Sequence, residues 1–158
     1  MTDLSIRLIH VISSALMLGV GVGAFWFMLT TVRSGNPMAI AVTTRNAVRA
    51  EWFIAAPVAF FQPLTGYILM MQLGYSLRSM WFLAVVALYM IAGVCWIYVI
   101  KTELKLRSLA EEHRNERTMP EAFWLLFRRW IKLAVCSFAG VLGIFWLMVF
   151  RPGVTNLF

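Results

Sequence analysis

His10 is the residue of this sequence with the clearest capacity for chemistry, because it lies inside a long apolar run near the N-terminus. An ionisable side chain within a membrane-length apolar segment is a functional candidate by default. Neutral imidazole is also the usual axial ligand of haem iron. Since Arg7 lies one turn away, an interfacial histidine is the plain alternative. Spacing alone leaves both interpretations open.

The residues that share a helical face with His10 suggest what such a ligand would meet. At 3.6 residues per turn, Ser14, Met17 and Gly21 fall on the same side of a helix as His10. This face presents an imidazole, a hydroxyl, a thioether and then a gap. We expect the gap to be wide enough for a flat, planar ligand.

The other histidine, His113, lies in a charged stretch, which we expect on the far side of a bilayer about 30 Å thick. The two histidines would then not bind one haem. A second axial ligand would come from the depth of His10, although most methionines in membrane proteins fill core space. The sequence does not choose among the side chains at that depth, which are Tyr67, Met70, Met71, Met80 and Met148.

Gln62 is the polar side chain expected nearest the middle of the bilayer, where an unsatisfied amide is costly. It precedes Pro63, and both Pro63 and Pro57 remove a backbone donor and kink a helix. Two interpretations remain open. Gln62 either caps freed carbonyls and bridges helices, or donates a hydrogen bond to a bound cofactor or quinone.

The two cysteines, Cys95 and Cys136, lie inside apolar runs. Their spacing matches no zinc site, c-type haem attachment site or redox pair. We therefore expect two small buried hydrophobic residues, and no metal site built from protein ligands alone.

The composition sets the elements that must position these side chains. Of 158 residues, 61% are hydrophobic and only 13% are charged, whereas a soluble domain has about 25% charged residues. A soluble domain, a disordered chain and a nucleic-acid-binding protein are thereby excluded. Apolar runs of about 20 residues predict membrane-spanning helices, and the runs cover residues 8–30, 51–72, 80–100 and 126–150. We predict an all-α four-helix transmembrane bundle that forms a single domain over residues 1–158.

Small residues predict where the helices pack, because helices in lipid approach closely at such positions. Ala15, Gly19 and Gly23 form one ridge, and Ala139 and Gly143 form another. We expect both ridges to make helix–helix contacts within the chain, with dimerisation as the minor alternative.

The connections indicate the orientation. Residues 31–50 are expected to form a loop with a turn at Gly35, residues 73–79 a tight hairpin, and residues 101–125 a charged connection broken by Pro120. Eleven of the 14 Lys and Arg residues lie in or beside the first and third connections, and three lie on the opposite side. Because basic residues stay cytoplasmic, we predict a bacterial inner-membrane protein with both termini in the periplasm.

The segment from Arg7 through His10 to Ser13 resembles the opening of the HemJ-type membrane protoporphyrinogen oxidases. Those are small four-helix proteins that bind haem b through that histidine, and the closing Arg151-Pro152 also fits their outline. The resemblance implies that His10 is a haem ligand. It does not carry over the functional lysine of these enzymes, because Trp81 is followed here by Phe82 and Leu83.

Over nearly its whole length, the chain is more similar to an uncharacterised family of predicted bacterial integral membrane proteins. That family resembles, at a distance, the HemJ and copper-resistance D proteins. The residues that carry the likeness are Gln62-Pro63-Leu64-Thr65-Gly66, Trp81-Phe82-Leu83, Cys95-Trp96, Arg129-Trp130, Leu147-Met148 and Arg151-Pro152.

Together these features predict a haem b-binding redox protein that transfers electrons and is linked to a quinol or a porphyrin-like donor. Its pocket would contain Ser14, Met17, Gln62 and Tyr67 around His10, with Arg7 against a haem propionate. The alternative is a non-catalytic accessory subunit of a larger membrane complex. Expected partners are the lipid bilayer and other membrane subunits or further copies of the chain, and no nucleic acid.

Overall fold

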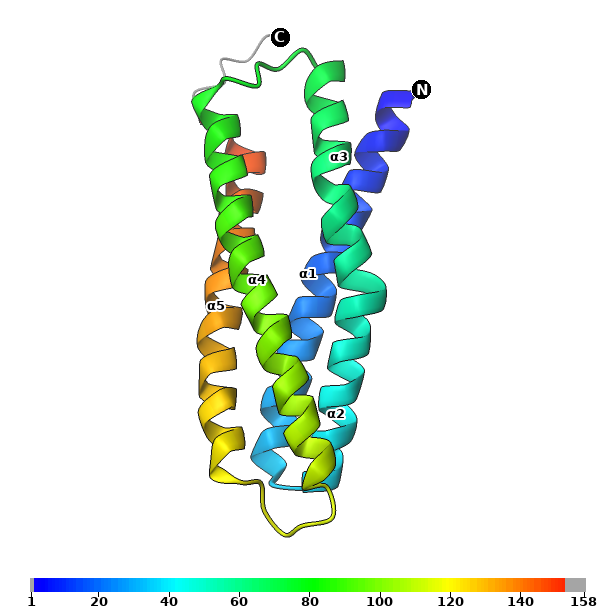
Figure 1. The fold of residues 1–158 in the computed structure, drawn as a ribbon. Helices are drawn as coiled ribbons and strands as arrows, with labels where there is room; N and C mark the ends of the chain where they lie inside the picture. The colour runs from blue at the N-terminus through cyan, green and yellow to red at the C-terminus, as the bar shows by residue number, and fades with distance from the viewer. Residues whose placement is uncertain (1, 153–158) are drawn as a thin grey trace.

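A computed structural model describes residues 2–152, and every regular element in that range is a helix (Figure 1). The elements are α1 (Thr2–Ser34), α2 (Pro37–Ala50), the π-helical turn η1 (Glu51–Ala55), α3 (Ala56–Gln72), α4 (Met80–Glu112) and α5 (Glu121–Phe150). Because α2, η1 and α3 follow one another without a break, they form one long rod. The predicted all-α fold with four membrane-length helices is confirmed.

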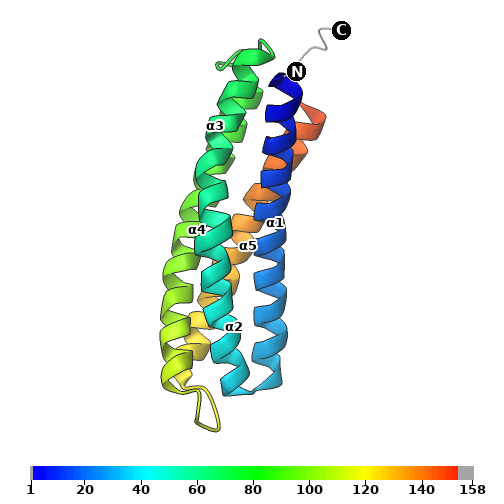
Figure 2. The same cartoon turned by 90° about the vertical axis from the view of Figure 1, so that its right-hand side faces the viewer.

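The four rods run up and down, so that α1 begins and α5 ends at the same end of the bundle (Figure 1, Figure 2). We call this the terminal end, and the opposite end, with the turn at residues 35–36 and the loop 113–120, the basic end. The most apolar 18-residue window of each rod is at most 22% buried within the chain. Lipid is the environment that matches so much uncovered apolar surface.

The prediction of a loop over residues 31–50 is wrong, because α2 occupies most of it. Gly35 makes the turn at φ +67°, and Asn36 caps α2 by accepting a hydrogen bond from the Ala39 amide at 3.2 Å. Apolar and small residues of α2 are then buried with the regular spacing of one helix face, namely Ile40, Ala41, Thr44, Ala47 and Val48. One face of α2 is buried against the bundle, and the other carries polar residues. Its sequence therefore lacks the continuous apolar run that predicts a membrane span.

Three predicted helices are longer than expected, and α1 extends beyond residues 8–30 at both ends. The helix predicted over residues 80–100 continues to Glu112, and the helix predicted from residue 126 begins at Glu121, directly after Pro120. Phe123, in the added turn, is fully buried. It belongs to a core cluster at the basic end that joins α1, α2, α4 and α5. Burial against neighbouring helices thus extends α4 and α5 beyond the apolar runs.

The two prolines of the long rod are accommodated differently. Pro57 follows η1, in which the Ala56 amide donates to the Glu51 carbonyl five residues back, a π-helical bond. Pro63 lacks the amide that would reach the Ala59 carbonyl. The hydroxyl of Tyr89 on α4 donates to that carbonyl instead, so the freed acceptor is satisfied by a neighbouring helix.

Close packing between helices is concentrated on α4 and α5. A Cβ atom built on Gly140 would lie 2.9 Å from Cβ of Ala92, and one on Gly143 would lie 3.1 Å from the Leu88 side chain. The predicted contact at Gly143 is therefore confirmed, whereas its partner Ala139 is exposed and Gly140 takes the closest position.

The predicted ridge on α1 makes no such contact. Ala15 is exposed, and a Cβ atom on Gly19 or Gly23 would meet nothing within 4 Å. The prediction of an internal helix contact is wrong for this ridge, because α1 packs mainly on α2 and α3 and barely meets α5. This face of α1 is left open within the chain.

The cysteines also differ from expectation. Cys136 is exposed and Cys95 half-buried, and their Sγ atoms lie 3.0 Å apart across the α4–α5 interface. The prediction of two buried, unrelated residues is wrong, because the antiparallel packing brings the middle of one helix against the middle of the other.

Replacing Gly140 by Val should weaken the bundle, because the added side chain would collide with the Ala92 methyl group. We expect the free energy of unfolding in detergent to fall by about 1–3 kcal/mol. Gly19→Val is the matched control, and it should change stability by less than about 0.5 kcal/mol. Equal losses in both variants would contradict the packing described here.

Mild oxidation of the purified protein should join Cys95 to Cys136 within one chain, since a small shift converts a 3.0 Å separation into a disulfide. Maleimide labelling should then detect no free thiol until a reductant is added. In Cys136→Ser, one thiol should remain reactive throughout. Disulfide-linked dimers in place of the internal bond would show that α4 and α5 pack otherwise.

Candidate functional site

A polar cluster lies between α1 and α3, on the face of α1 that carries His10. Nδ1 of the half-buried His10 is 2.7 Å from Oγ1 of Thr65. That hydroxyl also lies 3.1 Å from the carbonyls of Phe61 and Gln62, to which its single proton is donated. Thr65 therefore accepts from Nδ1–H, and we assign to His10 the neutral tautomer with its lone pair on Nε2.

Gln62 binds the same segment of α1 with both ends of its amide. Its Oε1 accepts from the Ser13 hydroxyl at 2.9 Å, while its Nε2 donates to the His10 carbonyl at 3.2 Å and to the Ser14 hydroxyl. Because these groups are engaged by α1, Gln62 acts as a bridge between helices. Of the two interpretations left open by the sequence, helix bridging describes these contacts.

The local sequence of each helix prepares these contacts. The single proton of the Ser13 hydroxyl is shared between Gln62 and the Ile9 carbonyl, which lies 2.6 Å away, and Ser14 donates to the His10 carbonyl at 2.7 Å. On α3, Gly66 leaves room for the imidazole, whose Cε1 would lie 3.4 Å from a Cβ atom at that position. Because Gly66 has no side chain, the His10 ring lies next to the backbone of α3.

The structure brings together only some of the other residues that were predicted to surround His10. Met17 and Gly21 are half-buried on the His10 face, and a Cβ atom on Gly21 would meet nothing within 4 Å. This face therefore borders open space at Gly21, and the expected fit of a planar ligand stays a prediction. Arg7 is exposed and Tyr67 is 50% exposed, so neither contributes to the polar cluster itself.

The proposed second ligands also separate. Met71 and Met80 are 58% and 81% exposed. Met70 is buried in a core cluster at the terminal end, and Met148 packs against that cluster. His113 ends α4 at the basic end, with Nδ1 2.9 Å from the Leu109 carbonyl. It lies at the opposite end of the bundle from His10, as predicted (Figure 1). Within residues 2–152 no group of three or more His, Cys, Asp or Glu side chains could bind a metal ion.

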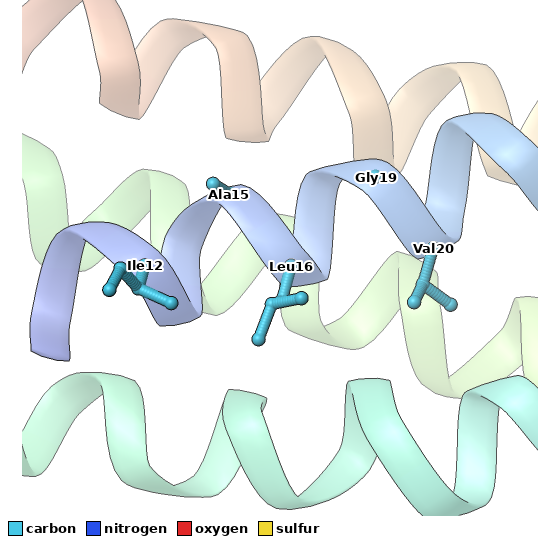
Figure 3. A pocket seen from close by; sticks show the side chains of 5 residues that line it. All are labelled: Ile12, Ala15, Leu16, Gly19 and Val20. Carbon is cyan, nitrogen blue, oxygen red and sulfur yellow. The ribbon is translucent and has the colours of Figure 1, made fainter.

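An open apolar groove of about 420 Å³ runs along the outer surface of α1. Figure 3 shows the residues that line it, which are Ile12, Ala15, Leu16, Gly19 and Val20. All belong to one helix, and Ala15 and Gly19 are members of the uncovered small-residue ridge. The groove is thus a lipid-facing or partner-facing surface, separate from the His10 cluster.

Sequence reasoning missed two buried acidic residues, Glu51 on η1 and Glu103 on α4. Both side chains are buried, with 5% and 1% exposed. A signal for Glu103 does exist, because Val99, Glu103, Leu106 and Ala110 follow one another at the four-three-four spacing of a buried face. Glu51 was missed because its helix was taken to begin there.

Gln62→Leu should loosen the α1–α3 interface, because it removes the only side chain here that bonds to both Ser13 and Ser14 among the described residues. We expect the free energy of unfolding in detergent to fall by about 1–2 kcal/mol. Gln72→Leu, at the exposed end of α3, is the control and should change little. A stable Gln62→Leu variant would show that the bridge contributes no net stability.

The comparisons with known proteins extend over nearly the whole described chain. The model of a family described as "Predicted integral membrane protein (DUF2269)" matches residues 4–152. No curated protein and no solved structure matches the chain. The match agrees with the four apolar helices and confirms the expected resemblance to an uncharacterised membrane family. The chain therefore belongs to the DUF2269 family of integral membrane proteins and crosses the bilayer four times.

Proposed function

We propose that this protein binds haem b in the membrane through Nε2 of His10 and transfers electrons. The observation that carries the proposal is the 2.7 Å contact between Nδ1 of His10 and Oγ1 of Thr65. With Nδ1 assigned as the donor, Nε2 keeps its lone pair. Histidines that bind metals donate their other ring N–H to a neighbouring group in this way. Such a bond fixes the tautomer and the orientation of the ring.

The surroundings of His10 are compatible with a planar group. The half-buried face continues through Met17 to Gly21, beside which there is open space. Arg7 lies one turn towards the terminal end and is exposed, so its guanidinium is free to approach a propionate. Met70 and Met148 are the predicted second ligands that face the protein interior. When bound, haem b would supply one-electron chemistry.

The direction of the chain follows from its charges. The first and third connections, with eleven of the 14 basic residues, are placed in the cytoplasm by this proposal. His10 then lies towards the periplasmic side of a bacterial inner membrane. A quinol or a porphyrin-like reductant would reach that depth from the lipid, which makes either a suitable electron donor.

A second candidate function is that of a non-catalytic accessory subunit. The observation that favours it is the open face of α1, where a Cβ atom on Gly19 or Gly23 would meet nothing within 4 Å in the described part of the chain. Small residues of this kind let another helix approach closely. In this case the uncovered face would pack on a larger membrane complex or on another copy of the chain.

Purified protein from haem-replete cells should show a Soret band, and His10→Ala should abolish it. His113→Ala is the matched control and should keep the full band, because His113 lies at the basic end. Thr65→Val removes the partner of Nδ1, and we expect haem affinity to fall by about 10- to 100-fold. Absorption spectra and haem titration measure these effects.

A colourless preparation would reject the haem proposal and favour the accessory subunit. If His10→Ala kept its colour, haem binding would stand but the assignment of its ligand would be wrong.

A further inference from the structure

The basic half of the bundle contains a buried acidic site. Glu51 projects from η1 and Glu103 from α4, and Glu51 bonds to Trp96, which lies two turns before Glu103 on the same face of α4. The two glutamates lie at the level of the core cluster that joins α1, α2, α4 and α5. Two carboxyl groups inside a membrane protein, removed from water, are costly to keep ionised together.

The carboxyl groups differ in their partners. Oε2 of Glu51 accepts a hydrogen bond from the indole Nε1 of Trp96 at 2.7 Å. Oε2 of Glu103 is buried without any hydrogen-bond partner, although the side chain is only 1% exposed. An acceptor so deeply buried is rarely left unsatisfied.

An unsatisfied donor lies at the same level of the bundle. The indole Nε1 of Trp130 on α5 also lacks a partner, and this side chain is 2% exposed. Because Cys136 faces Cys95 across antiparallel helices, the register places Trp130 at about the level of the Thr102–Glu103 turn of α4. A buried donor and a buried acceptor, neither with a partner among the described residues, thus occur at the same level of the core.

No basic side chain neutralises the two glutamates within residues 2–152. The ion pairs of this region join Arg45 and Arg114 to Glu111. The other basic residues of the surrounding helices are exposed or half-buried and form no ion pair with either glutamate, namely Arg33, Arg49, Lys101, Lys105, Arg107, Arg128, Arg129 and Lys132. Binding of a proton is therefore the means by which the negative charge of the two glutamates is reduced.

We propose that Glu51 and Glu103 form a buried proton-binding site at the basic end of the bundle, completed by a water molecule between Trp130 and Glu103. Water can accept from the indole N–H and donate to the carboxyl oxygen, which satisfies both unpaired groups. A proton on the pair removes the repulsion between two carboxylates and is released or taken up without any other reactant. This inference is independent of haem binding, because it involves neither His10 nor Thr65.

Infrared difference spectroscopy of the protein in lipid vesicles, labelled with ¹³C-glutamate, tests the proposal. At neutral pH we expect the C=O stretching band of a protonated glutamic acid, which is lost in Glu103→Gln. Trp96→Phe should shift the band, since it removes the hydrogen bond to Glu51. Glu116→Gln, in the exposed loop, is the matched control and should leave the band unchanged.

Circular dichroism and gel filtration would establish that each variant is folded. If Glu103→Gln does not fold, a pH titration of the unaltered protein still tests the proposal. The C=O band of the protonated glutamic acid should persist above the pH at which exposed glutamates ionise. The proposal is overturned if no protonated glutamic acid is present at neutral pH, or if the band survives in folded Glu103→Gln. A band that appears only when sodium is removed would assign the site to a metal cation and also overturn it.

Discussion

The interior of a bilayer offers no water to a polar group, so the amides, hydroxyls and indoles of this bundle must find partners in the chain. This constraint explains how α1 is held against α3, since the Gln62 amide and the Thr65 hydroxyl meet the polar groups around His10. It also explains why the Tyr89 hydroxyl reaches the carbonyl that Pro63 leaves free. At the basic end, Glu103 Oε2 and Trp130 Nε1 are buried without a partner among the described residues, and for that reason the two are assigned to binding rather than to stability.

The helices could be predicted where the helical segment is also a long apolar run. Long apolar runs gave α1, α3, α4 and α5, because lipid-facing segments are apolar on all sides. α2 did not follow from hydropathy, because only one face of it is covered and the other carries polar groups such as Arg45 and Asn46. The helix extensions at both ends of the loop 113–120 were missed for the same reason.

The candidate site shows a similar division. His10 stood out because an imidazole is rare in an apolar run, and Ser14 and Met17 followed from helical periodicity alone. Thr65 was not predicted as its partner, because the register between α1 and α3 depends on packing that no local pattern contains. The Cys95–Cys136 contact was missed on the same ground.

The two polar centres are joined by one rod, which carries Glu51 on η1 and Thr65 on α3. The rise of a helix places these residues roughly 21 Å apart, where two unit charges at an effective dielectric constant of about 20 interact by only about 0.8 kcal/mol. If His10 holds a redox group and the glutamates a proton, as proposed, the direct electrostatic coupling between them would be weak. Stronger coupling would require movement of the rod, and its π-helical turn and Pro57 and Pro63 lie between the centres. These irregular positions have fewer backbone hydrogen bonds to break, so any motion that links the two ends is expected to bend there.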